Sequence, residues 1–342
     1  MKTLLLALAV AASVASVGIA QSTAFDRLSP EVLDVVPPSQ RVRGIPGALE
    51  PLSGSCRRLP TTAVRRRIVD VAVQEWGFFG FTVVDQTRDE PVGQTTRRGR
   101  RRWPRLSPSE AARVADSIAG YWTVTPQGSW IIESQNQRWN SSDGGSTRWR
   151  YPWSAAFVSW VMCEGGLGES SQFQRAVAHH TYIDQAIRAR DGAASQAAFT
   201  AFDIGETAIS PGDLLCSGRR PAYRTLADRR RQMGEGARSH CDVVVKLDAE
   251  RDRILAIGGN VRGTVSLKLL PAASAEPGQN LRPSGGARPM FAHLKLRAEP
   301  IDGDALDGSP TMTALTCDDG FQPSARLAAA KLVDAGSAAA RC

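Results

Sequence analysis

The chain has 342 residues, six cysteines and a formal net charge of +8, and much of its basic charge lies in clusters of arginine. The length allows one large core or two modest ones, and the basic balance suits anionic partners such as cell-wall glycopeptide, a membrane surface or nucleic acid. The cysteine spacings include no paired C-x-x-C, so they argue against a zinc site of that kind.

Residues 1–20 have the pattern of a secretory signal peptide. Lys2 precedes an apolar stretch from Leu4 to about Ala12, and small residues follow up to Ala20, as in cleaved export signals. No later window reaches the roughly 18 consecutive apolar residues that a membrane span needs. We therefore expect a soluble, monomeric protein exported to the periplasm or the medium, which makes nucleic acid the least expected of the anionic partners.

Export also permits disulfides. Pairing of Cys317 with Cys342 is the bond we favour, since it would hold down the C-terminal tail. Spacing alone leaves the other four cysteines open, either as disulfides or as buried thiols.

Four helices are expected before any strand. Residues 21–59 are rich in Pro, Ser and Gly and predict an extended leader segment, followed by a domain over 60–298. A helical face begins at Val64 and ends at Gly77, and a capping box with Pro at its first position opens a second helix at Ser107. A third helix is expected from about Trp153 to Glu164 and a fourth over 171–190. The basic run 97–102 is interpreted as a solvated loop or as a contact with an anionic surface.

The second half of the domain has short segments rich in Val, Ile and Leu, separated by Gly, Asp and Pro, which is typical of strands. They cover 213–216, 241–248, 254–257, 264–270 and 291–297. Helices followed by strands predict an α+β domain with N-terminal helices packed on a five-stranded antiparallel sheet. Residues 299–342 are expected to form a tail, with one more helix allowed over 324–340.

Ser154 is the candidate nucleophile. It is expected in the first turn of the third helix, where unpaired N–H groups and the helix dipole favour negative charge. The alternative is that Ser154 only caps the helix.

His240 and Asn260 are the candidate base and its orienting residue. His240 immediately precedes a strand, and Asn260 follows Gly258-Gly259 at the end of the next one. An imidazole at a strand edge can face a helix start, and an amide oxygen can fix its tautomer. His240 could instead be an ordinary surface or capping residue, and Gly-Gly-Asn could be a simple turn. His179, His180 and His240 lack metal-ligand spacing, so neither a metal nor a cofactor is expected.

Several motifs together resemble bacterial domain-of-unknown-function family 2272 over about residues 62–297. They are listed here in chain order: Trp153-Ser154-Ala155-Ala156-Phe157-Val158-Ser159-Trp160, His179-x-x-Tyr182-Ile183, Pro211-Gly212-Asp213-Leu214-Leu215-Cys216, His240-Cys241-Asp242-Val243-Val244 and Ile257-Gly258-Gly259-Asn260-Val261. More distantly, the helix, the Pro-Gly-Asp and the strand-leading His resemble CHAP amidases and NlpC-type peptidases, which cut amide bonds in bacterial cell walls.

This resemblance implies a papain-like fold, with catalytic roles for Ser154, His240 and Asn260. It also implies that His179, with Tyr182 and Trp153 nearby, lines a substrate pocket. The chain departs from those enzymes at Ser154, where they have cysteine. A serine is not a thiolate at rest, so His240 would have to remove its proton during attack.

Two functions follow as hypotheses. The first is an exported cell-envelope hydrolase of amide or peptide bonds, related to peptidoglycan and using Ser154, His240 and Asn260. The second is an inactive domain that binds peptidoglycan peptides or a protein partner in the same cleft. The arginine-rich loop 217–239 could fold over the pocket, attract acidic substrates and lower the pKa of His240, or it could simply be exposed.

Overall fold

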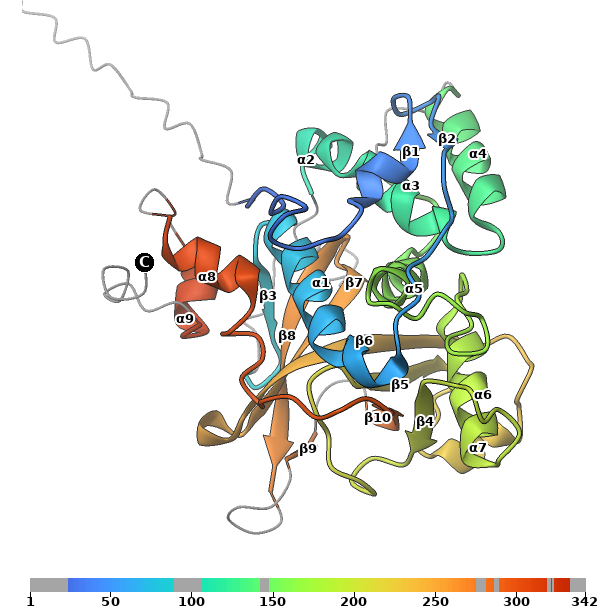
Figure 1. Ribbon diagram of the computed structural model, residues 1–342, viewed down its shortest axis with the longest axis vertical. Helices are drawn as coiled ribbons and strands as arrows, with labels where there is room; N and C mark the ends of the chain where they lie inside the picture. Colours follow the sequence, from blue (N-terminus) through green and yellow to red (C-terminus); the bar gives the residue numbers. More distant parts are fainter. Residues whose placement is uncertain are drawn as a thin grey trace, which may run out of the picture.

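The protein is described from a computed structural model, which covers residues 24–88, 106–141, 148–274, 281–285, 289–318, 321 and 323–332. The expected signal peptide, the basic run 97–102 and Cys342 lie outside these described residues. Within them the chain forms a mixed α+β arrangement, with helices packed against one large sheet (Figure 1).

The sheet has eight strands, in the order β3-β8-β7-β6-β5-β10-β4 with β9 paired to β8. Their bounds are β3 Thr82–Asp85, β4 Phe199–Phe202, β5 Leu214–Arg220, β6 Arg238–Asp248, β7 Arg253–Val261, β8 Thr264–Ala273, β9 Arg282–Pro283 and β10 Met290–Leu296. All five predicted strands are present, but the five-stranded antiparallel sheet was wrong. The sheet has three further strands, and β3 runs parallel to β8.

The three strands that the sequence did not predict lie toward the margins of the sheet. β3 and β4 have four residues each and β9 has two. Strands this short carry too little alternation to be recognised. Pairing with β8 gives β3 its structure, and β8 is distant in the sequence.

The helices cover one face of the sheet and its edges (Figure 1). Their bounds are α1 Val64–Phe78, α2 Pro108–Arg113, α3 Ala115–Thr123, α4 Gly128–Trp139, α5 Ser154–Glu164, α6 His179–Arg190, α7 Leu226–Arg230, α8 Pro310–Thr316 and α9 Ala325–Ala329. The predicted second helix is two helices that meet at Val114, and the predicted fourth begins at His179. The helix allowed over 324–340 is seen as α9, and residues beyond 332 are outside the described part.

Helix α5 lies at the centre of the fold. All 11 of its residues are buried, which is expected of a helix that is apolar on every side. It packs on β6 and β7 and is flanked by α1 and α3. The N-terminal end of α5 is thereby fixed against the middle of the sheet.

The segment predicted as an extended leader is packed against the helices from residue 24 on. Leu33, Val35 and Leu49 are buried in the main core, and Arg27 forms an ion pair with Glu75 of α1 at 2.6 Å. A short two-stranded sheet, β1 Val42–Arg43 and β2 Glu50–Pro51, lies in this segment, together with the 3-10 helices Pro38–Arg41 and Thr61–Ala63.

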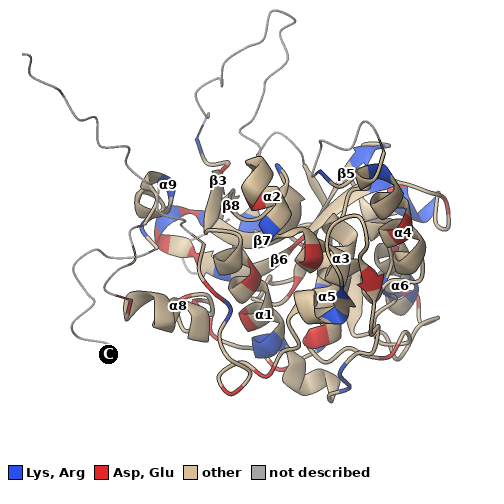
Figure 2. Cartoon of the chain, turned by 90° about the horizontal axis from the view of Figure 1, so that it is seen from above, with Lys and Arg blue, Asp and Glu red and all other residues tan. Residues whose placement is uncertain are grey.

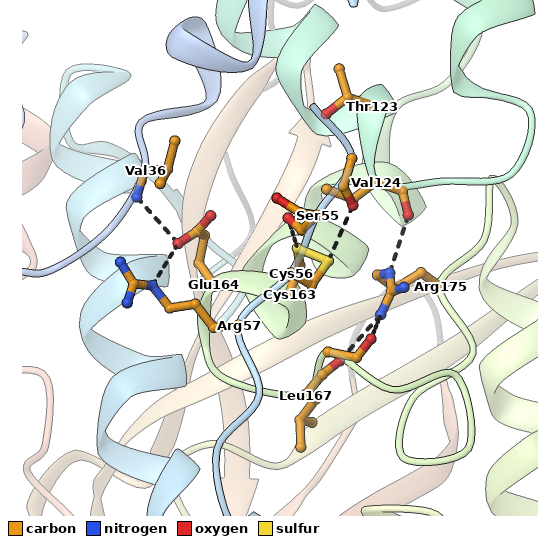
Figure 3. Close-up of a disulfide and its surroundings, with 12 residues drawn as sticks. Val36, Ser55, Cys56, Arg57, Thr123, Val124, Cys163, Glu164, Leu167 and Arg175 are labelled. Atoms are coloured by element: carbon orange, nitrogen blue, oxygen red, sulfur yellow. Dashed lines mark hydrogen bonds and ion pairs between the residues drawn. A yellow bond between two sulfur atoms is a disulfide. The ribbon is translucent and has the colours of Figure 1, made fainter. Parts of the chain in front are cut away.

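Two disulfides join pairs of cysteines within the described part of the chain. Cys56 is bonded to Cys163 near the end of α5, where Glu164 accepts a hydrogen bond from the Val36 N–H and forms an ion pair with Arg57 (Figure 3). Cys216 of β5 is bonded to Cys241, its direct neighbour on β6. These four residues are therefore disulfides and not buried thiols. Cys317 is also disulfide-bonded, and its predicted partner Cys342 is outside the described residues.

The sheet has a core on each face. The main cluster, on the face covered by the helices, takes Cys241, Val243 and Val245 from β6, and a second cluster takes Val244. Because side chains alternate along a strand, this assignment places Asp242 on the face away from the main core. Among the described residues no helix is long and apolar enough to cross a membrane.

Candidate functional site

Ser154 is the first residue of α5, and its hydroxyl does not cap the helix. The residue before it, Trp153, occupies the N-cap position and makes no side-chain cap bond. The Ser154 Oγ instead lies 2.7 Å from Nε2 of His179. The first helical hydrogen bond runs from the Phe157 N–H to the Trp153 carbonyl. The N–H groups before Phe157 therefore have no partner within the helix.

His179 is held in one orientation and one tautomer. It is the first residue of α6 and is buried, with 4% exposure. Its Nδ1 accepts the Cys241 N–H at 3.2 Å, and the Tyr182 hydroxyl also bonds to this nitrogen. Because Nδ1 accepts, Nε2 carries the proton in the neutral ring and donates to Ser154.

Burial, together with the nearby His240, lowers the pKa of His179 well below its usual value. The ring is therefore neutral at neutral pH. In this arrangement the Ser154 oxygen receives a hydrogen bond from His179, and His179 has no lone pair with which to take the serine proton.

The position of His179 follows from a separation of two strands. The β6–β7 ladder begins at Asp248 and Arg253 and stops at Val243 and Ile257. Beyond that point Cys241 is still paired to β5, while its N–H bonds to His179. The imidazole of α6 thus takes the place that a neighbouring strand would otherwise occupy.

His240, Asp242 and Lys268 form a buried chain of polar groups beside His179. His240 and Asp242 are alternate residues of β6 and so share a face. The Nε2 of His240 is 2.8 Å from one carboxylate oxygen of Asp242, and the Lys268 Nζ is 2.7 Å from the other. Their exposures are 5%, 0% and 8% respectively.

The charges of Asp242 and Lys268 in this set of buried polar groups are complementary. Burial alone would raise the pKa of Asp242, but His240 and Lys268 outweigh it and hold the pKa below its usual range. Burial lowers the pKa of His240; Asp242 opposes this, while Lys268 and Arg219 add to it. Since the ionised carboxylate accepts the Nε2 proton, Nδ1 is the basic nitrogen of a neutral His240.

The two imidazoles join the two halves of the site. The ring centroids of His179 and His240 are 5.2 Å apart. Within the described residues the hydrogen bonds link Ser154 to His179 and His240 to Asp242, and none links Ser154 directly to His240. The site therefore has a hydroxyl beside a donor imidazole, and that imidazole lies beside a second, basic one.

Gly258 and Gly259 allow this packing. A Cβ on Gly258 would lie 2.0 Å from the Asp242 carboxylate and 3.0 Å from His240 Nε2, and a Cβ on Gly259 would lie 2.5 Å from Phe157. The Gly-Gly pair thus lets β7 approach the site on one face and α5 on the other.

Asn260 follows at the end of β7, half-buried and with a φ of 54°. It was expected to orient His240, but the group bonded to Nε2 is Asp242. Asp242 and Lys268 were not predicted in this role from the sequence. His240-x-Asp242 on a predicted strand was the available signal, because the alternation of a strand puts both side chains on one face.

The two aromatic residues expected to line a pocket are inside the main core. Trp153 is 2% exposed and stacks on Tyr121 with centroids 5.8 Å apart. Tyr182 is 1% exposed and packs on Phe173 at 4.8 Å. Tyr182 contributes to the site through its hydroxyl, which is bonded to His179.

The arginine-rich segment 217–239 has both a buried anchor and an exposed basic part. Arg229 is fully buried and pairs with Asp184 of α6 at 2.6 Å, which fastens the segment beside the site. The other arginines are exposed: Arg219, Arg220, Arg224, Arg230, Arg231 and Arg238. Basic residues are visible around the end of β5 in Figure 2.

This combination defines an α+β protein with a buried polar site where the start of a central helix meets β6, with His240, Asp242 and Lys268 on the sheet face away from that helix. Among the described residues no three His, Cys, Asp or Glu are grouped to hold a metal ion. Residues 111–287 match the model of an uncharacterised protein family conserved in bacteria, DUF2272. Because the match covers just over half of the chain, the protein belongs to that family. No curated protein and no solved structure matched the chain.

Proposed function

We propose that the protein is an exported hydrolase of amide or peptide bonds in the cell envelope, related to peptidoglycan, with Ser154 as its nucleophile. The observation that carries the proposal is the contact of Ser154 Oγ with His179 at 2.7 Å, next to a second imidazole paired with a carboxylate. A helix start facing a histidine-bearing strand is also the arrangement expected of a papain-like fold of the CHAP or NlpC type.

In the proposed reaction the Ser154 oxygen bonds to the substrate carbonyl carbon and its proton passes to Nδ1 of His240. This transfer requires the Ser154 side chain to turn from His179, and it requires the His240 ring, which shares a face of β6 with Asp242, to reach the serine through the gap between β6 and β7. The C–N bond then breaks, His240 returns the proton to the leaving amine, and water hydrolyses the ester that remains. Asp242 orients His240 and stabilises the imidazolium in the way that a triad carboxylate does.

His179 and the start of α5 supply the electrostatic part of the proposal. The Nε2–H of His179 points at the Ser154 oxygen, and the N–H groups of Ala155 and Ala156 precede the first helical bond. Donors fixed in a buried site stabilise negative charge that develops on a carbonyl oxygen. A neutral His179 fits this role, since it donates a hydrogen bond without titrating.

Export is supported by the disulfides. Cys56–Cys163, Cys216–Cys241 and the disulfide-bonded Cys317 suit the oxidising periplasm or medium. The leader over residues 1–20 has the corresponding pattern.

The test is covalent labelling and turnover. A fluorophosphonate probe should modify Ser154 of the oxidised mature protein in one-to-one ratio, as mapped by mass spectrometry. Soluble fragments from a cell-wall digest should gain new amino termini. Ser154→Ala should abolish both signals. Ser159→Ala, on the same helix and fully buried with its hydroxyl bonded to Ala176, should keep them.

A second function is favoured by one observation, namely that His179 donates to Ser154 and leaves the serine proton without a bonded base. In that case the site binds envelope peptides or a protein partner without cutting. Absence of both labelling and turnover in the folded wild type, with binding of the fragments unchanged by Ser154→Ala, would establish this alternative.

A further inference from the structure

We propose that Arg220 and Arg238 form a binding site for a carboxylate group of the substrate, beside His240. The inference deepens the proposed function and rests on it, because it assigns a chemical class to the substrate of that site.

The two arginines face one another across neighbouring strands. Arg220 of β5 and Arg238 of β6 are direct partners in the register, and both are exposed. Like charges in opposed positions destabilise a sheet, so this pairing has a cost in the free protein. An anion placed between the two guanidinium groups would remove that cost.

Neither of these arginines has an acidic partner among the described residues, whereas others in the same segment do. Arg230 pairs with Asp191 at 2.8 Å and Arg231 pairs with Asp228 at 2.6 Å. Arg229 is bound to Asp184. Arg220 and Arg238 are therefore a pair of positive charges at the end of the segment that adjoins the site.

The spacing along β6 connects the arginine pair to the chemistry. Arg238, His240 and Asp242 are alternate residues and lie on one face of the strand. Arg238 is two residues from His240, about 7 Å along the strand. An extended peptide covers the same length with two residues. A carboxylate at the arginine pair would thus belong to the residue one or two positions from the scissile bond.

The field of this basic segment extends to the site itself. The charge of Arg219, next to Arg220, is one of the causes that lower the pKa of both His179 and His240. Guanidinium groups bind carboxylates through two parallel hydrogen bonds, which gives geometry as well as affinity. The substrate class that fits is a peptide or amide with a free side-chain or terminal carboxylate.

The experiment measures binding in the Ser154→Ala variant, so that no turnover is needed. The probes are N-acetyl-Ala-Glu-Ala-amide and N-acetyl-Ala-Gln-Ala-amide, which differ only in carboxylate against carboxamide. We expect the Glu peptide to bind about tenfold more tightly in NMR titrations, the scale of a charge-assisted hydrogen bond. Arg220→Gln/Arg238→Gln should remove this preference. Arg326→Gln, an exposed arginine on α9, should leave it intact.

Equal binding of the two peptides, no measurable binding of the Glu peptide, or a preference that survives the double substitution would each overturn the inference. A preserved preference in a protein that hydrolyses nothing would instead count against the proposed hydrolase alone. The two ideas therefore fail in different measurements.

Discussion

Gly258→Ala tests whether the close approach of β7 holds His240 and Asp242 together. The new Cβ would lie 2.0 Å from Asp242 Oδ1, where ordinary contacts begin at 3.4 Å. The carboxylate must therefore retreat by about 1.4 Å, the difference between the two distances. Its 2.8 Å bond to His240 and its 2.7 Å bond to Lys268 cannot both survive that movement.

The expected loss of stability can be bounded. Breaking a buried, hydrogen-bonded charge pair costs about 3–5 kcal/mol. Replacing Gly with Ala also stabilises the protein by about 0.4–1 kcal/mol, because it restricts the unfolded chain. We therefore expect Gly258→Ala to lower the free energy of unfolding by about 2–5 kcal/mol, measured by urea denaturation with the disulfides oxidised.

A double-mutant cycle isolates the cause. In the Asp242→Ala background the clashing oxygen is absent, so Gly258→Ala should cost only about 1 kcal/mol or less. Gly259→Ala is the matched control, since its Cβ would meet Phe157 at 2.5 Å and no charged group within the site. It should destabilise the protein without moving the NMR resonances of the His240 imidazole, whereas Gly258→Ala should move them. Additive effects of Gly258→Ala and Asp242→Ala would refute this reasoning.

Three further predictions concern charge and cross-links. Burial raises the pKa of Asp70 to about 6 from 3.8, so at neutral pH Asp70→Asn should stabilise the protein, in urea denaturation, by up to about 3 kcal/mol at 1.36 kcal/mol per unit. The gain should shrink as pH falls through 6 and vanish below 3.8, and a gain independent of pH would contradict the cause. The pKa of His240 is lowered below 6.5, so its stabilising contribution is complete above that pH and is lost as pH falls through the folded pKa. Urea midpoints of His240→Asn should therefore fall less on acidification than those of the wild type. Replacing Cys56 and Cys163 by Ala opens a loop of 107 residues, and urea denaturation should show a loss of about 5 kcal/mol on the chain-entropy estimate. A loss below about 2 kcal/mol would argue that the N-terminal segment stays docked in the unfolded chain.

Local sequence patterns were sufficient for the elements that carry Ser154 and His240. The apolar face of the run after Trp153, ended by Gly165-Gly166, predicted α5, and the structure buries every residue of this helix. The valine-rich run after Cys241 predicted β6 through its β-branched side chains. Both patterns depend on neighbours in the chain, so a single sequence contains them.

The residues that bond to Ser154 and His240 depend on which helices and strands pack together, and no local sequence pattern determines that packing. Lys268 reaches Asp242 only because β8 lies two strands from β6, on the far side of β7. Strand order is a property of the whole sheet and leaves no local pattern. The pairing of Asp242 with His240 could have been predicted from the sequence, since their spacing on a strand puts both side chains on one face.

His179 shows most clearly why sequence motifs alone do not predict the role of every residue in a site. A histidine at the start of a helix is compatible with a surface position, a metal ligand or a base. What decides among these roles is the gap between β6 and β7 on the N-terminal side of Val243, which exposes the Cys241 N–H to the ring. That N–H makes Nδ1 an acceptor and leaves the proton on Nε2, directed at Ser154. If nitrogen-15 shifts showed His179 protonated at Nδ1, the ring would be free to accept the serine proton and His240 would lose its place as the base.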